Sequence, residues 1–76
     1  MKELLLYIAQ NLVDEPDAVF VNETEVDGTV VLELHVAQKD MGKVIGRQGK
    51  IAREIRAIVR SMAQRSNQKV SVEIVD

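Results

Sequence analysis

The chain has 76 residues, no cysteine and a single histidine, so disulfides, cysteine-rich zinc sites and histidine-built metal sites are excluded. Hydrophobic residues make up 46% and charged residues 29%, as in an ordinary folded domain rather than a disordered tail. No apolar stretch approaches the roughly 20 residues that span a membrane, and the first residues do not resemble a signal peptide. We therefore expect a cytoplasmic protein with no membrane association and one domain over residues 1–76.

The net charge of −2 hides an uneven distribution. Residues 1–38 carry one basic and eight acidic residues, a net charge of −7, whereas residues 39–76 carry nine basic and four acidic residues, a net charge of +5. A basic face of this kind attracts an anionic partner such as nucleic acid. Solvated helix faces are also often basic without any ligand, so the charge alone leaves both interpretations open.

In the first half of the chain, the pattern predicts a helix followed by a hairpin. Apolar residues at helical spacing predict a helix over residues 2–13, which must end before Pro16. A strand is expected over residues 19–26, and Asp27-Gly28 is a strong two-residue hairpin signal. The return strand, residues 29–37, alternates apolar and polar side chains, which predicts one buried and one solvated sheet face.

The second half predicts two helices and a final strand. Asp40 is expected to cap the N-terminus of a short helix that ends at Ile45, with Gly46 as its stop. A longer helix is expected after Gly49, to about Arg65, and a strand over residues 70–75. The apolar stripe of the long helix comprises Ile51, Ile55, Ile58 and Met62, widened by Ala52, Val59 and Ala63.

These elements follow one another in the order α-β-β-α-α-β. The predicted fold class is α+β, a two-layer sandwich with three helices on one face of a three-stranded sheet. The hairpin pairs its strands antiparallel, and the last strand follows a two-helix crossover, so a mixed sheet is expected.

The candidate functional motif is the segment Gly46-Arg47-Gln48-Gly49, which joins the two predicted helices of the second half. Glycine lacks Cβ and lets another molecule approach the backbone closely. The first N–H groups of the following helix have no partner inside the helix and carry a partial positive charge, which suits a phosphate. Lys43, Arg47 and Lys50 add positive charge around the motif.

The run Val44-Ile45-Gly46-Arg47-Gln48-Gly49, followed by a basic helix and a strand, resembles the KH domain of RNA-binding proteins. The family core would be residues 29–75, with the GxxG loop at residues 46–49. The helix and strand within residues 2–26 precede that core, which resembles the type II, prokaryotic arrangement. The short length resembles free-standing bacterial single-KH proteins.

The resemblance implies a protein that clamps a short single-stranded RNA segment, acting as an RNA chaperone or a post-transcriptional regulator. In such a loop Gly46 and Gly49 shape the backbone, and Arg47 and Gln48 present their side chains to the RNA backbone. The other residues implied in RNA binding are Lys50 and Lys43, the groove residues Val44 and Ile45, and Arg53.

Arg53, Arg56, Arg60 and Gln64 form a second stripe on the long helix. This stripe either extends the phosphate path away from the loop or is a solvated face.

Catalysis is not expected. A P-loop needs glycine where this chain has Val44 and serine or threonine where it has Ile51, and no nucleophile–base pair is placed on a rigid face. No cofactor, metal or small-molecule substrate is expected either.

A rival hypothesis is a protein-interaction module. It is motivated by surplus apolar surface at Ile58, Val59 and Met62. The resemblance implies homodimerisation or pairing with a larger KH-containing protein.

Overall fold

The computed structural model describes residues 1–75 and confirms the predicted α+β fold and its α-β-β-α-α-β order. The helices are α1 (Lys2–Gln10), α2 (Met41–Ile45) and α3 (Lys50–Arg65), and the strands are β1 (Phe20–Val26), β2 (Thr29–His35) and β3 (Lys69–Val75). Short 3₁₀ turns occur at Pro16–Ala18, Gln38–Asp40 and Arg47–Gly49. Within residues 1–75, no helix is both long enough and apolar enough to cross a membrane.

The three strands form one mixed sheet in the order β1-β2-β3. β1 pairs antiparallel with β2 through the hairpin turn, where Asp27 and Gly28 both have positive φ, at 51° and 81°. This backbone is the one that an Asp-Gly turn favours, because its twist matches that of the flanking strands. β3 pairs parallel with β2, with Val72 opposite Leu32, because α2 and α3 carry the chain back to the end where β2 begins.

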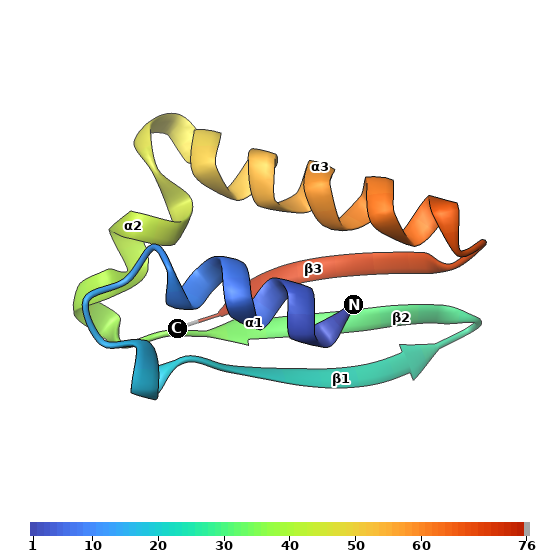
Figure 1. Cartoon of the computed structure of the whole chain (residues 1–76), viewed down its shortest axis with the longest axis horizontal. Helices are drawn as coiled ribbons and strands as arrows, with labels where there is room; N and C mark the ends of the chain where they lie inside the picture. Colours follow the sequence, from blue (N-terminus) through green and yellow to red (C-terminus); the bar gives the residue numbers. More distant parts are fainter. Residues whose placement is uncertain (76) are drawn as a thin grey trace.

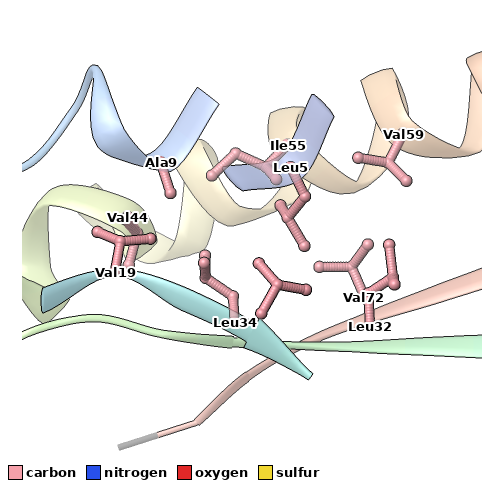
Figure 2. Packing of buried hydrophobic residues seen from close by; sticks show 10 residues of the cluster. Leu5, Ala9, Val19, Leu32, Leu34, Val44, Ile55, Val59 and Val72 are labelled. Atoms are coloured by element: carbon pink, nitrogen blue, oxygen red, sulfur yellow. The ribbon is translucent and has the colours of Figure 1, made fainter. Parts of the chain in front are cut away.

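Helices and sheet form two layers around one apolar core (Figure 1). α1 and α3 lie over one face of the sheet, and α2 sits at the end of the molecule opposite the β1–β2 turn (Figure 1). Figure 2 shows the core side chains pointing between these layers. The buried cluster comprises Leu5, Ala9, Val19, Val21, Leu32, Leu34, Val44, Ile55, Val59 and Val72.

The buried stripe of α3 is rotated from the predicted one. Its buried residues are Ala52, Ile55, Val59 and Ala63, whereas Ile58 and Met62 lie on the flank and are 47% and 39% exposed. The buried side of α3 includes two small alanines, so the helix packs through a different side from the one that its larger aliphatic residues indicated. The prediction that Val59 belongs to an exposed apolar surface is therefore wrong, since Val59 is fully buried.

Two element boundaries differ by more than one residue from those expected. α1 ends at Gln10 rather than near residue 13. Asn11 follows it, and its Nδ2 donates to the carbonyl of Tyr7 in the last turn at 2.8 Å. β2 ends at His35 rather than residue 37, because the chain then turns into the 3₁₀ segment Gln38–Asp40.

Charged side chains lie beside both outer strands of the sheet. On β1 only Val21 is buried, and Glu23 and Glu25, which share its face of the strand, are exposed. At the other edge, Arg56 of α3 donates from Nε to the carbonyl of Val72 on β3 at 3.1 Å.

Candidate nucleic-acid interface

The connection between α2 and α3 is a tight turn whose backbone has positive φ at three of four positions. Gly46 closes α2 by donating its N–H to the Gly42 carbonyl at 2.9 Å, and it then adopts φ 75° and ψ 178°. Gln48 and Gly49 follow with φ of 55° and 76°. The Gly49 N–H donates to the Gly46 carbonyl at 3.2 Å, which draws the two glycines together.

The two glycines are required for different reasons. A Cβ at Gly46 would overlap the side chain of Ile51 and lie 2.9 Å from its backbone nitrogen. A Cβ at Gly49 would meet only the Arg53 guanidinium, at 3.7 Å. Gly46 is therefore fixed by both space and backbone angle, whereas Gly49 is required by its angle alone.

Arg53 supports this loop from the first turns of α3. Its Nη1 donates to the Gln48 carbonyl at 2.8 Å, so the guanidinium holds the residue whose positive φ is the most costly of the three. This hydrogen bond positions the loop, and only the other N–H donors of the guanidinium are free for another partner.

The tip of the loop is exposed and positively charged. Arg47, Gln48 and Lys50 are exposed, and within residues 1–75 neither Arg47 nor Lys50 forms an ion pair. The first turn of α3 contains no acidic residue, so the positive end of its dipole is not neutralised locally. The tip therefore combines two free cationic side chains with the N-terminus of a 16-residue helix.

Lys43 does not belong to this free set. Its ammonium lies 3.1 Å from Asp14 Oδ2 and 3.6 Å from Asp40 Oδ1. The hydrogen bond to Asp14, reinforced by the charges of both carboxylates, raises the pKa of Lys43. Its positive charge is thus largely compensated by the protein itself.

Asp40 is fully buried, and its side chain does not cap α2 as the sequence predicted. It makes no side-chain capping bond to α2, and its two carboxylate oxygens instead accept the backbone N–H groups of Asp14 and Glu15 at 3.2 and 3.0 Å. Burial raises the pKa of Asp40, but these two hydrogen bonds and the charge of Lys43 outweigh it, so the pKa lies below its usual value. Asp40 thereby ties the segment after α1 to the start of α2.

The aliphatic pair before the loop is divided between core and surface. Val44 was predicted to line a groove, but its side chain is fully buried in the core cluster. Ile45 is 37% exposed and lies next to Gly46. Val44 is the one buried residue of α2, whereas Ile45, one position further, turns about 100° around the helix towards solvent.

A GxxG turn between two helices, set in an α-β-β-α-α-β chain with a mixed sheet, defines a KH domain of type II. The family model described as KhpA/KhpB, KH domain, matches residues 2–74, and the chain belongs to this family.

Curated relatives match along essentially the whole chain. A protein of Clostridium perfringens named RNA-binding protein KhpA is 52% identical over 75 residues, covering 99% of this chain and 100% of the relative. A Chlamydia trachomatis protein of the same name is 46% identical over 76 residues, covering 100% of this chain and 97% of the relative.

Solved structures of Era share the fold at low sequence identity. The crystal structure of an Aquifex aeolicus Era matches with a TM-score of 0.66 and 22% identity, covering 96% of this chain and 28% of that chain. A structure of Era in complex with MgGDPNP and a segment of 16S ribosomal RNA matches with the same values. At this identity the likeness concerns the fold alone.

Proposed function

We propose that this chain is a non-catalytic RNA-binding protein that clamps a short single-stranded RNA segment at Gly46–Gly49. In this role it acts in the cytoplasm as an RNA chaperone or post-transcriptional regulator, without a cofactor or a small-molecule substrate. The observation that carries the proposal is the match over residues 2–74 to a family whose curated members are named RNA-binding protein. The loop supports it, because Arg47 and Lys50 are exposed and uncompensated beside a helix N-terminus.

The proposed roles follow the geometry of the loop. Backbone N–H groups at the start of α3 and the side chains of Arg47, Gln48 and Lys50 bind phosphate oxygens. Arg53 positions the loop, Ile45 offers an apolar surface beside it, and Lys43 contributes less than the free cations because Asp14 and Asp40 compensate it.

Gly49→Asp tests the proposal at the loop. The change places a carboxylate where the phosphate is expected, at a position whose left-handed backbone aspartate tolerates and where an added Cβ meets only the Arg53 guanidinium, at 3.7 Å. Gly28→Asp is the matched control, since Gly28 also has positive φ and open space but lies at the far end of the molecule, in the hairpin turn.

We expect Gly49→Asp to weaken binding of a single-stranded RNA tetranucleotide, which occupies the loop region alone, at least tenfold, a loss of about 1.4 kcal/mol. Gly28→Asp should bind within about twofold of the parent protein. The measurement is fluorescence anisotropy on proteins shown to be folded by circular dichroism. A folded Gly49→Asp variant that binds as well as Gly28→Asp would falsify the clamp.

A second candidate function is protein interaction through α3, by homodimerisation or by pairing with a larger KH-containing protein of the KhpB type. The observation that favours it is the exposure of Ile58 and Met62 side by side on one flank of α3. Two weak RNA sites joined in a dimer would also bind a common RNA more tightly.

Sedimentation velocity over a concentration series tests the homodimer. The parent protein should sediment faster as its concentration rises, and Ile58→Asp should remain a monomer throughout. Ala57→Asp adds the same charge at an exposed neighbour about 100° around the helix and should behave like the parent. A parent protein that stays monomeric up to high micromolar concentration, with and without RNA, removes self-association.

A further inference from the structure

A hollow of about 250 Å³ lies between the C-terminal half of α3 and the start of β3. Its lining contains no carboxylate and comprises Thr29, Arg60, Gln64, Gln68, Lys69 and Val70. Arg60 and Lys69 are exposed, and within residues 1–75 neither forms an ion pair. The hollow therefore presents two cations that form no ion pair, together with two amide side chains that both donate and accept hydrogen bonds.

The hollow lies on the side of α3 that carries a row of arginine residues starting near the loop. Arg53, Arg56, Arg60 and Gln64 follow one another at intervals of three, four and four residues, which keeps them on one side of the helix. The contact of Arg56 with the Val72 carbonyl fixes that side beside β3. Figure 1 shows α3 running from the loop to the turn that precedes β3, so the loop and the hollow are at opposite ends of this helix.

The four side chains of this stripe are not equivalent. Arg53 and Arg56 each donate to a main-chain carbonyl, of Gln48 and Val72 respectively. Arg60 is the first guanidinium of the stripe with no such contact among the described residues, and it lies roughly 15 Å along the helix from Lys50. Free positive charge is therefore concentrated at the loop and again at the hollow.

We propose that the hollow at Arg60 and Lys69 is a second phosphate subsite, which binds single-stranded RNA that leaves the loop and follows α3. The inference rests on the proposed function and adds to it the length of the bound RNA and the direction in which it runs along α3. Arg60 and Lys69 bind a phosphate, and Gln64 and Gln68 bind a base edge or a 2′-hydroxyl.

The same geometry limits the path. A neighbouring hollow shares Gln68 and Lys69 but is also lined by Glu25 and Asp27. Two carboxylates there repel a phosphate, so the RNA path ends at Lys69 rather than continuing around the hairpin turn.

A comparison of a tetranucleotide with a decanucleotide tests the subsite. Four nucleotides occupy the loop region of a KH domain, so only the decamer reaches the hollow. Each phosphate contact on single-stranded RNA contributes about −0.7 to the slope of log K against log salt. We expect the decamer slope to be steeper than the tetramer slope by roughly 1.4 if Arg60 and Lys69 both contribute.

Arg60→Gln/Lys69→Gln should return the decamer to the tetramer slope and weaken its binding roughly threefold to tenfold at low salt, with the tetramer unaffected. Each single variant should remove about half of the extra slope. Arg65→Gln is the matched control, because Arg65 carries the same charge on the same helix but lies about 140° away from Arg60.

The outcomes separate this inference from the proposed function. If the double variant keeps the decamer slope of the parent, or if Arg65→Gln lowers it equally, the subsite is overturned while binding at the loop stands. If the parent protein binds neither oligomer, the proposed function fails and the subsite fails with it. Loss of decamer slope in the double variant alone supports the subsite.

Discussion

At the scale of single residues, the two glycines of the loop are required for different physical reasons. Gly46 combines an extended ψ with a positive φ, a region that only glycine enters readily, and its missing Cβ leaves room for Ile51. Gly49 has an ordinary left-handed backbone with space around it. Two identical residues in the motif are thus held by different physical requirements.

Alanine substitutions should reveal this difference in stability. Gly49→Ala should lower the free energy of unfolding by about 1–2 kcal/mol, the usual cost of a left-handed residue with a side chain. Gly46→Ala should cost roughly 3 kcal/mol or more, because backbone strain is added to overlap with Ile51. The measurement is urea denaturation at neutral pH.

Gly42→Ala provides a control of opposite sign. Gly42 lies inside α2 with no atom near its absent Cβ, so alanine should stabilise the protein by about 0.5–1 kcal/mol. Equal losses for Gly46→Ala and Gly49→Ala would contradict the distinction between the two loop positions.

At the scale of elements, Asp40 connects the segment after α1 with the helix that carries the loop. Its buried carboxylate accepts two backbone N–H groups from Asp14 and Glu15, and Lys43 completes the cluster. The carboxylate satisfies donors that the chain turn would otherwise leave unpaired. The position of α2 therefore depends on a hydrogen bond between Asp40 and Asp14, which are 26 positions apart in the sequence.

This cluster predicts a dependence of stability on pH. The folded-state pKa of Asp40 is lowered from 3.8, so its stabilisation is present above the unfolded-state value and is lost as the pH falls towards the folded-state value. Asp40→Asn should lower the urea midpoint at pH 7, and its deficit relative to the parent should shrink as the pH falls below about 4. Asp17→Asn, a change at an exposed acid in the same segment, should show no such convergence. A deficit of Asp40→Asn that stays constant from pH 7 to pH 3 would rule out this linkage.

The orientation of α3 makes a second prediction at this scale. Val59→Ala should lower the free energy of unfolding by about 2 kcal/mol, because it removes two buried methyl groups from the core. Ile58→Ala removes more atoms from a half-exposed position and should cost about 1 kcal/mol or less. Chemical denaturation of both variants decides the matter, and the reverse ranking would contradict the observed rotation of the helix.

Much of the fold could be predicted because its signals are local. The span of α3 and the Asp27-Gly28 turn follow from periodicity and turn chemistry over a few residues. Which of two adjacent aliphatic residues, Ile58 or Val59, faces the core depends on packing against the sheet, which no local pattern contains. The role of Asp40 was missed for the same reason, since its hydrogen-bond partners are distant in sequence.

At the scale of the whole molecule, opposite charges lie on different elements of the structure. The acidic residues of the first half lie on α1, β1, β2 and the connections between them, whereas seven of the nine basic residues of the second half lie on α2, the loop and α3. A chain with a net charge of −2 can therefore still offer an anion one strongly favourable approach.

This arrangement predicts a shallow but definite salt dependence for RNA bound at the loop alone. Two or three phosphate contacts give a slope of log K against log salt of roughly −1.5 to −2 for a tetranucleotide. Titrations between about 50 and 200 mM potassium chloride measure it. A slope near zero would mean that binding does not involve the phosphates, and the charged loop tip would then have no role in it.

The protected edges of the sheet decide how copies of this chain can meet. An unpaired outer strand normally invites a neighbouring molecule to add its own strand, which leads to open-ended aggregation. Here Glu23 and Glu25 place negative charge beside one edge strand, and Arg56 occupies a main-chain carbonyl of the other. Growth of an open-ended assembly by strand addition is therefore disfavoured at both edges of this sheet.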